Sequence, residues 1–344
     1  MKKGIGSDGY VLVENDTHTI TVTGGVAYDS DDAEYKGTAG IKADNYFGMT
    51  GGTVTITNSG AGGKGIRAGS EDYDGDISAS YISGGSLSIT TTGSESNDVS
   101  CKGMKIGWAT KSGNKVTGYA GNLNISGGSV VVSASKSEGI EAKGNLTISD
   151  NAQVYVTSSG DDAINCQAEF DVTGGYVYAY SSANDAMDAN HDLKISGGYV
   201  FAVTTAGSPE VAIDANTEES YKLYITGGVV VAYGGLESGY SSSNTVYSMG
   251  CTAGSWNALH NGSSYIAAFK APSGVSTVAV CAPSLKSGYK GVSVGSTTYA
   301  NGIWATSSIS GGTSVSLSTY SGGGGGQGGP GGNTGGGGGG PGGH

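Results

Sequence analysis

A short apolar phrase followed by Ser or Thr and two glycines recurs along the first two thirds of the chain. In its most regular part the apolar residues that precede Ser or Thr are Ile125, Ile148, Val172 and Ile195, so the spacings are 23, 24 and 23 residues. A fixed period of this length is typical of a solenoid or of an array of stacked units. The chain is therefore expected to stack short coils along one axis.

A second phrase, Gly-Ile-x-Ala and its variants, recurs once in each unit. It occupies residues 40–43, 65–68, 103–106, 139–142, 163–166, 186–189 and 212–215. Each unit thus carries three short strands with apolar residues at alternate positions, separated by turns. Leucine-rich repeats need a denser leucine pattern, and the nonapeptide calcium roll needs a shorter period. Parallel strands joined by turns alone must climb as a coil, which predicts an all-β fold, a right-handed parallel β-helix with coils of about 23 residues.

The repeat divides the chain into three parts. Residues 1–235 are predicted to form the parallel β-helix. Residues 236–320 keep β-rich patterning without the repeat and are predicted to form a small all-β domain or cap. Residues 321–344 are almost pure Gly with Pro, Gln and Asn, a composition that buries no apolar surface, so they are predicted to be a disordered tail.

Composition and charge limit the classes of partner. The formal net charge of −12 argues against a nucleic-acid partner, because nucleic acids attract basic surfaces. No apolar run approaches the ~18 residues that span a bilayer, and residues 1–6 lack the apolar segment of a secretory leader. A composition rich in Tyr, Gly, Ser and Thr and poor in Lys favours an extracellular or cell-surface protein, whose leader is absent from this chain. We expect the protein to be a monomer. Four cysteines are too few for a disulfide framework, and pairing of Cys251 with Cys281 stays open.

The third residue of each Gly-Ile-x-Ala phrase is expected to face solvent, so these residues form a column along the coils. The column changes from basic to acidic: Lys42, Arg67, Lys105, Glu141, Asn165, Asp188 and Asp214. Equivalent positions of neighbouring coils lie about 4.8 Å apart, which brings together a group of carboxylates and amides: Asp161, Asp162, Asn165, Asn184, Asp185, Asp188 and Asp214.

Carboxylates this close repel each other by roughly 1 kcal/mol per pair in water-like surroundings. They must be solvated, protonated or bound to a cation, and carboxylate, amide and backbone oxygens suit Ca²⁺. The alternative is that Asp and Asn merely suit the turns. Because the segment from residue 151 to residue 220 holds eleven Asp or Glu and one cation, Lys194, we predict a calcium site there.

A second candidate calcium site lies in the segment from residue 71 to residue 76. Asp72, Asp74 and Asp76 have the alternate spacing of the first half of a calcium loop, with Gly75 inside it. No Glu follows at the distance that completes such a loop, so a solvated acidic loop is the alternative.

Outward positions after the double glycines form an aromatic column. Its members are Tyr155, Tyr178 and Phe201, with Tyr176 and Tyr199 beside them. Exposed aromatic rings on a flat sheet offer a surface on which sugar rings stack. The alternative is that the chain after Gly235 folds back and covers the column.

The repeat, the phrases at residues 160–165 and 184–190 and the Gly-rich C-terminus resemble the clostridial carbohydrate-binding β-helix proteins. The resemblance extends over residues 14–320. It implies a secreted or surface protein that contains calcium and binds cellulose and acidic, pectin-like polysaccharides.

The fold is also similar to that of the family-nine pectate lyases, whose calcium pocket uses one Asp followed a coil later by Asp-Asp-x-x-Asp. The positions that match are Asp162 (or Asp161), then Asn184, Asp185 and Asp188, so an amide replaces one carboxylate. This replacement lowers the charge of the site relative to the lyases.

Those lyases also use a basic residue to remove the proton next to the uronate carboxyl. Lys194 is the only candidate base in the acidic segment, and the alternative is that it pairs with Asp171 or Asp192. No Ser–His pair or phosphate loop is visible.

Three functions follow from these observations. The preferred one is a non-catalytic, calcium-containing protein that binds plant cell-wall glycans, either cellulose or polygalacturonate-like polymers. The second is a calcium-dependent pectate lyase that cleaves polygalacturonate by β-elimination with Lys194 as base. The third is a structural adhesin stalk on the cell surface.

Overall fold

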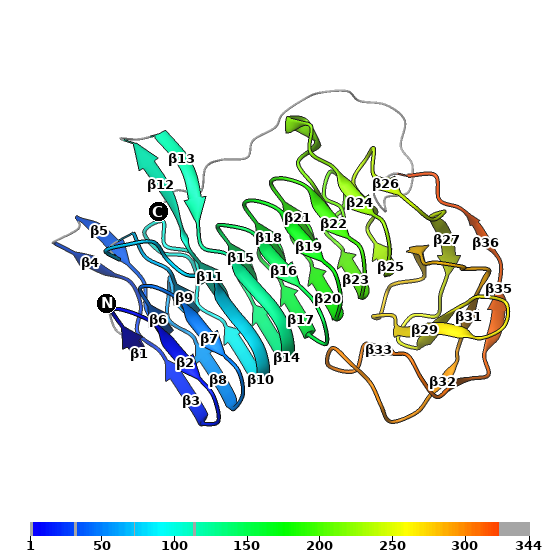
Figure 1. The fold of residues 1–344 in the computed structure, drawn as a ribbon, viewed down its shortest axis with the longest axis horizontal. Coiled ribbons are helices and arrows are strands. Elements are labelled where there is room, and N and C mark those ends of the chain that lie inside the picture. Colours follow the sequence, from blue (N-terminus) through cyan, green and yellow to red (C-terminus); the bar gives the residue numbers. More distant parts are fainter. Residues whose placement is uncertain (1–2, 31–32, 72, 113–114, 323–344) are drawn as a thin grey trace.

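The computed structural model of the chain describes residues 3–30, 33–71, 73–112 and 115–322 (Figure 1). Within those ranges the protein is all-β, with one 3₁₀ turn, η1 (Thr217–Glu219), and no α-helix. No helix in these described ranges is long and apolar enough to cross a membrane. Of the predicted tail, residues 323–344 lie outside the described part of the chain.

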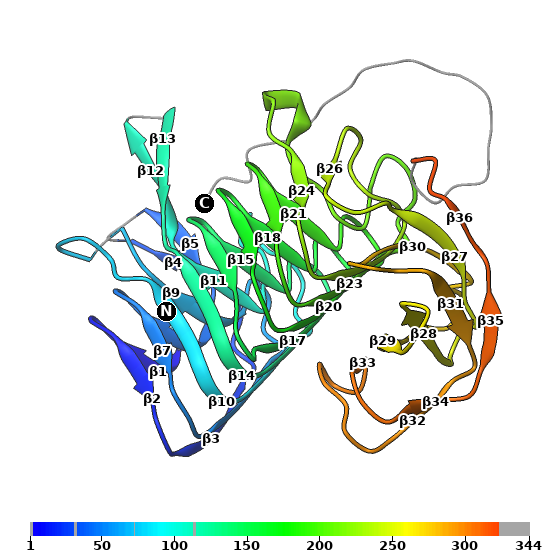
Figure 2. The same ribbon diagram turned by 45° about the vertical axis from the view of Figure 1, so that its right-hand side comes forward.

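Three rows of parallel strands run along the molecule, and successive strands of a row come from successive repeats (Figures 1 and 2). The first row consists of β1 (Lys3–Ser7), β6 (Ala39–Ala43), β9 (Lys64–Ala68), β11 (Met104–Ile106), β15 (Ile140–Ala142), β18 (Ile164–Cys166) and β21 (Met187–Ala189). The second row consists of β2 (Val11–Val13), β7 (Phe47–Met49), β10 (Ser80–Thr91), β14 (Leu123–Ala134), β16 (Leu146–Ile148), β19 (Phe170–Val172), β22 (Leu193–Ile195), β24 (Leu223–Ile225) and β26 (Ser241–Ser242).

The third row begins with β3 (Thr17–Val22) and β8 (Thr53–Asn58). It continues through the second halves of β10 and β14 to β17 (Gln153–Ser158), β20 (Tyr176–Ser181), β23 (Tyr199–Thr204) and β25 (Val229–Tyr233). The repeats therefore contribute one strand to each row, as the sequence predicts, except that the phrase at residues 212–215 joins the first row only through isolated bridges at Ile213.

The apolar residues of the repeat form one core between the rows. Ile41 pairs in register with Ile66, and both are fully buried, as are the equivalent Met104, Ile140 and Ile164. Inward burial of Ile and Ala in the Gly-Ile-x-Ala phrases is thus confirmed. Because each coil covers the apolar side chains of the next, burial of this core along the axis stabilises the stack.

The double glycines are needed where one turn stacks on another. Gly198 has a φ of +74°, and a Cβ there would lie 2.5 Å from the carbonyl oxygen of Gly174 in the preceding coil. Gly228 repeats this arrangement over Gly197, with a φ of +73°. Positive φ and close backbone approach both exclude a side chain, which explains why the phrase carries Gly-Gly.

Two antiparallel hairpins interrupt the coils and lengthen the repeats that contain them, whereas the loop that carries η1 lengthens the repeat between Ile195 and Ile225. They are β4 (Ala27–Asp29) with β5 (Glu34–Lys36), and β12 (Trp108–Ser112) with β13 (Lys115–Ala120). Figure 1 shows β12 and β13 projecting from the stack.

After β26 the pairing becomes antiparallel, and we call residues 243–322 the C-terminal β region. Its strands are β27 (Tyr247–Gly250), β28 (Trp256–His260), β29 (Tyr265–Lys270), β30 (Thr277–Cys281), β31 (Ser287–Lys290), β32 (Ser293–Val294), β33 (Trp304–Ala305), β34 (Ile309–Ser310), β35 (Thr313–Val315) and β36 (Leu317–Thr319). β30 pairs with β25, the last strand of the third row, and so joins the region to the coils. The four cysteines are all buried and free, so Cys251 and Cys281 do not pair in this structure.

Candidate functional site

The turns between the third and first rows are held by a column of hydroxyl groups at the ends of β17, β20 and β23. Ser181 Oγ donates to the carbonyl oxygen of Asp161 at 2.7 Å, and Thr204 Oγ1 donates to that of Asn184 at 2.6 Å. The backbone N–H of Asn184 donates in turn to Ser181 Oγ at 3.0 Å. This side-chain capping fixes the loops that carry the acidic residues predicted to bind calcium.

The predicted carboxylates and amides do come together, and we call the seven residues of the prediction the acidic network. Asn165 donates from Nδ2 to Asp162 Oδ2 at 3.0 Å and to Asp188 Oδ2 at 2.6 Å. Asn184 Nδ2 donates to Asp161 Oδ1 at 2.9 Å, and the backbone N–H of Asp185 donates to Asp162 Oδ1 at 3.1 Å. Asn165 therefore bridges the carboxylates of two neighbouring coils, and Asn184 binds one carboxylate of the preceding coil.

The carboxyl groups of the acidic network are so close together and so buried that their ionised forms are disfavoured. Burial, together with the neighbouring carboxylates, raises the pKa of Asp185 to about 8 and that of Asp188 to about 7. Burial raises the pKa of Asp162 well above its usual range, with further contributions from Asp188 and Asp161. Carboxylates in this state bind either protons or a cation.

Sequence reasoning missed one member of the group, Glu237. Leu236 bridges to Ile213 in parallel register, so Glu237 continues the outward column beyond Asp214. Burial and the hydrogen bond to Glu237 raise the pKa of Asp214 to about 10, whereas hydrogen bonds to Asp214 and Ser238 lower the pKa of Glu237. The signal in the sequence is the position of Glu237 one repeat after Asp214, next to an apolar residue.

The outward column of the first row has the predicted register, but its middle is not exposed. Lys105 pairs with Arg67 on one side and with Glu141 on the other. Glu141 is only 2% exposed, because Lys102 and Lys143 approach it at 2.8 and 2.7 Å. The expectation that this position faces solvent is therefore wrong for Glu141, whose charge is compensated by ion pairs instead.

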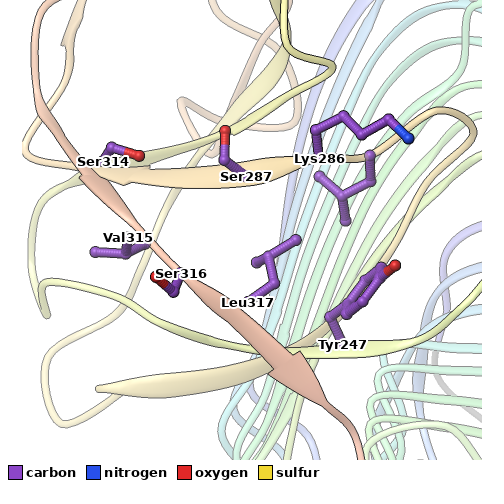
Figure 3. A pocket seen from close by; sticks show the side chains of 8 residues that line it. Tyr247, Lys286, Ser287, Ser314, Val315, Ser316 and Leu317 are labelled. Atoms are coloured by element: carbon purple, nitrogen blue, oxygen red, sulfur yellow. The ribbon is translucent and has the colours of Figure 1, made fainter.

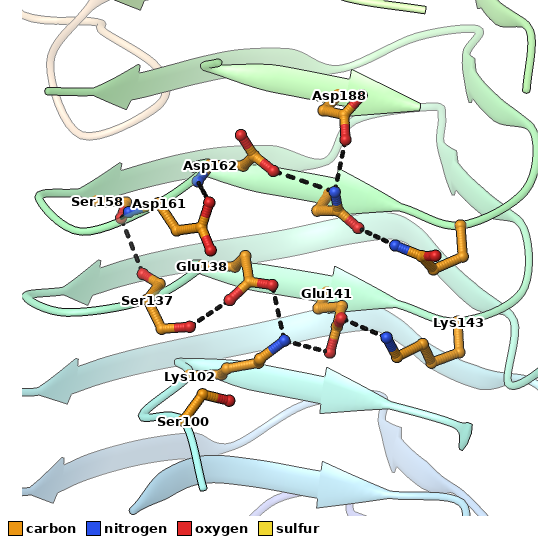
Figure 4. A network of polar contacts seen from close by, with 12 residues as sticks. Ser100, Lys102, Ser137, Glu138, Glu141, Lys143, Ser158, Asp161, Asp162 and Asp188 are labelled. Carbon is orange, nitrogen blue, oxygen red and sulfur yellow. Dashed lines mark hydrogen bonds and ion pairs between the residues drawn. The ribbon is translucent and has the colours of Figure 1, made fainter. Parts of the chain in front are cut away.

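Figure 4 shows how this ion-paired group adjoins the acidic network. Lys102 lies between Glu138, at 2.6 Å, and Glu141, and Asp161 and Asp162 follow in the turn that leads into the next strand, β18. The first row thus changes from basic to acidic across one buried set of ion pairs.

Lys64, on the basic side of this boundary, gives a measurable dependence of stability on pH. It is buried, its Nζ donates to the carbonyl oxygen of Ser100 at 3.1 Å, and burial together with Lys105 and Arg67 lowers its pKa from 10.5 to about 7. Between pH 7 and 10.5 the unfolded chain binds more protons at this residue than the folded chain, so its contribution to the free energy of unfolding increases with pH.

We therefore expect wild type to become more stable relative to the Lys64→Met variant as the pH rises. The difference in free energy of unfolding should grow by about 2 kcal/mol between pH 7 and pH 9, since the limiting slope is about 1.4 kcal/mol per pH unit. Urea unfolding of both proteins in a low-salt buffer measures this difference. A difference that stays constant over the range would contradict a lowered pKa for Lys64.

The predicted aromatic column is largely covered. Phe201 is 0% and Tyr178 4% exposed, and they pack in one cluster with Phe269 and Trp304 of the C-terminal β region. The prediction that these two rings are exposed is therefore wrong, and the alternative that the chain after Gly235 covers the column is confirmed: β30 pairs with β25, and apolar side chains of the C-terminal β region pack on the third row.

The other three rings of the predicted column lie at the margin of this interface. Tyr155, Tyr176 and Tyr199 are half-buried, and Tyr176 is sandwiched between Tyr199 and Tyr299, with ring centroids at 4.9 and 3.9 Å. Tyr299 belongs to the C-terminal β region. These rings therefore contribute to the contact between the two parts of the chain.

A second aromatic column, which sequence reasoning missed, lies on the first coils. Tyr10 stacks on Tyr46 with centroids 5.2 Å apart and planes 10° apart, and Tyr46 stacks on Tyr81 at 6.0 Å and 27°. Tyr10 is 56% exposed. Gly48 makes room for this tyrosine stack, because a Cβ there would lie 2.8 Å from the Tyr81 ring. The signal in the sequence is a Tyr at the start of three consecutive repeats.

Lys194 lies apart from the acidic network. It is on β22 in the second row, whereas the network belongs to the first row and its adjoining turns. Its Nζ contacts Glu169 at 3.2 Å and Asp192 at 3.5 Å. The alternative of pairing with Asp192 is confirmed, with Glu169 rather than Asp171 as the second partner, and these contacts raise the pKa of Lys194, opposite to what a general base needs.

The second candidate calcium site is not assembled in the described residues. Asp72 lies outside them, and Asp74 and Asp76 are exposed. Across the described ranges, no group of three or more His, Cys, Asp or Glu side chains is arranged to hold a metal ion.

One surface hollow of about 410 Å³ lies in the C-terminal β region, between β31 and β36 (Figure 3). Tyr247 and Lys286 lie at one end and Ser287 and Ser314 at the other. It shares no residue with the acidic network.

Comparison with known proteins gives the class to which these features belong. The chain matches the family described as "Carbohydrate-binding domain-containing protein" over residues 1–182 and 109–268. The chain therefore belongs to this family of carbohydrate-binding domain-containing proteins. No curated protein and no solved structure matches the chain.

Proposed function

We propose that this protein is a non-catalytic protein that binds the polysaccharides of plant cell walls, acting outside the cell that makes it or at that cell's surface, as a monomer. Membership of the carbohydrate-binding family is the observation that carries the proposal. The three rows of parallel strands support a finer description, a right-handed parallel β-helix up to about residue 235 followed by a small β cap. Right-handed connection is the rule for parallel strands in one sheet.

The tyrosine stack formed by Tyr10, Tyr46 and Tyr81 is the proposed surface for neutral glucan chains such as cellulose. Sugar rings present apolar C–H faces that pack on aromatic rings, and the stack places three such rings along the axis of the coils. No described strand covers it in the way that the C-terminal β region covers Phe201.

Replacing Tyr46, the middle ring, is expected to weaken binding to cellulose about tenfold. Loss of one sugar–ring contact, at about 0.5–1.5 kcal/mol by analogy with pairs of aromatic rings, accounts for this change. Depletion assays on microcrystalline cellulose with Tyr46→Ala measure it. The matched control is Tyr119→Ala, since Tyr119 is 43% exposed on the β13 hairpin and stacks with no other ring in the described ranges. Equal affinities for the two variants would contradict a role for the stack.

We also propose that the acidic network holds Ca²⁺. The carboxylates of Asp162, Asp185 and Asp188 support this, because hard cations prefer oxygen ligands. Asn165 and Asn184 turn their amide nitrogens toward the carboxylates, so they would supply amide oxygens to the ion only after their amide groups turn over. The bound ion would neutralise charges that now repel each other, and it would offer a ligand position to a uronate carboxylate of a pectin-like chain. Catalysis is not part of the proposal, since Lys194 is paired in another row.

A further inference from the structure

The basic half of the first row carries positive charge that its own carboxylates do not balance. Six cations and three carboxylates lie together on the neighbouring coils, a formal excess of three positive charges: Lys42, Lys64, Arg67, Lys102, Lys105 and Lys143 against Asp44, Glu138 and Glu141. The whole chain carries a net charge of −12, so this excess runs against the composition.

The ion pairs are unevenly distributed within this group. Lys42 contacts Asp44 at 2.7 Å, and Lys102 and Lys143 share Glu138 and Glu141. Arg67 and Lys105 have no ion pair in the described residues, although both are half-buried. Lys64 has no ion pair there either, since its Nζ donates to the carbonyl oxygen of Ser100, so the positive excess lies on these three side chains.

Arg67 and Lys105 occupy paired positions on adjacent strands, β9 and β11. Neighbouring strands lie about 4.8 Å apart, and like charges at that separation repel each other, more strongly when partly removed from water. Burial and the neighbouring cations, Lys102, Lys143 and Arg67, lower the pKa of Lys105 to about 8 even though Glu141 acts in the opposite direction. Such a pair is stabilised when an anion lies between the two side chains.

We infer that Arg67 and Lys105, with Lys64 behind them, form a calcium-independent subsite for the carboxylate groups of an acidic polysaccharide. This inference rests on the proposed polysaccharide-binding function and adds a second site for its acidic ligand. A guanidinium fork donates two parallel hydrogen bonds to a carboxylate, and an ammonium group adds a point charge.

The position of the subsite indicates how the polysaccharide lies relative to the axis of the coils. The same row of strands carries the acidic network from Asn165 onward, in register with Arg67 and Lys105. A polyuronate lying along the coils meets fixed cations on β9 and β11, in the middle of this row, and the proposed calcium site beside β18 and β21, at its end. Both places thereby attract the same kind of group, although their own charges are opposite.

The test compares Arg67→Gln/Lys105→Gln with wild type and with Lys222→Gln, which removes an exposed cation elsewhere on the coils. In EDTA, which removes the calcium contribution, the double variant should bind oligogalacturonate at least tenfold more weakly than wild type, whereas Lys222→Gln should bind as wild type does. Binding of the double variant should also depend less on salt concentration, since two cations fewer contact the ligand. Lys105→Arg should retain affinity.

A second readout uses inorganic sulfate as the probe and does not depend on polysaccharide binding. Low millimolar sulfate should raise the melting temperature of wild type and of Lys222→Gln but not that of the double variant, and the Lys105 pKa measured by NMR should rise with sulfate. Unchanged oligogalacturonate affinity in the double variant, or equal stabilisation of all three proteins by sulfate, overturns the subsite. Failure of wild type to bind any polysaccharide, with a sulfate effect specific to Arg67 and Lys105, would instead overturn the proposed function and leave the anion subsite standing.

Discussion

Trp304→Ala is expected to lower the free energy of unfolding by about 3–5 kcal/mol, the usual cost of removing a large buried aromatic side chain. Trp304 is 0% exposed and fills the contact between the C-terminal β region and the third row, where its ring lies 6.4 Å from that of Phe201 and 6.2 Å from that of Phe269. Its Nε1 also donates to the carbonyl oxygen of Val177 at 3.0 Å, so the substitution leaves a buried acceptor without its partner.

Urea unfolding measures the loss, and limited proteolysis shows where it acts. Cleavage of the variant should increase after β25, where the C-terminal β region begins to cover the row, while the coils remain resistant. Trp256→Ala is the control, because Trp256 is half-buried at the margin of a smaller cluster and should cost less than half as much. Equal losses for both substitutions would contradict the view that the covered aromatic column holds the two parts together.

Calcium is expected to stabilise wild type by about 2.7 kcal/mol at one hundred times its dissociation constant, and to have no effect on Asp185→Asn/Asp188→Asn. Asparagine resembles a protonated carboxyl in shape and cannot repel its neighbours. Because the pKa of Asp185 is raised to about 8, the ionised form costs folding free energy in EDTA at pH 8, and the variant should then be at least as stable as wild type.

The expected pattern is therefore a variant that gains nothing from calcium although it is not destabilised without it. Thermal unfolding with EDTA, Ca²⁺ and Mg²⁺ measures the pattern, and Mg²⁺ should act weakly, since it demands a stricter octahedral geometry. Asp74→Asn/Asp76→Asn, in an exposed loop, is the matched control and should respond to calcium as wild type does. Calcium stabilisation that is the same in both double variants, or absent from wild type, would rule out the acidic network as the binding site.

The strands of the repeat were predictable because each strand pairs with the equivalent strand of the next repeat, and the repeat period identifies which residues are equivalent. Ile41 and Ile66 are inward residues of a phrase that recurs, so their pairing follows from the sequence alone. The approach of Asp162, Asp185 and Asp188 was predictable for the same reason, since equivalent positions of stacked coils must be neighbours.

The environment of those residues was decided by the tertiary structure. Phe201 and Tyr178 alternate outward just as an exposed binding surface requires, but the returning chain buries them under Trp304, a residue more than one hundred positions away and outside the repeat. Glu141 occupies an outward position yet is buried, because it forms ion pairs with Lys102 of the preceding coil and with Lys143, two residues further along the chain.

The sequence by itself determined which side chains are neighbours along the coils, since a period translates directly into register. Only the tertiary structure decided which of those columns remain exposed: the tyrosine stack of Tyr10, Tyr46 and Tyr81 is accessible, while the column that ends at Phe201 is covered. The physical reason is that burial of an outward column depends on which chain segment covers it. The covering segment here is the C-terminal β region, whose sequence has no repeat and therefore does not indicate where it packs on the coils.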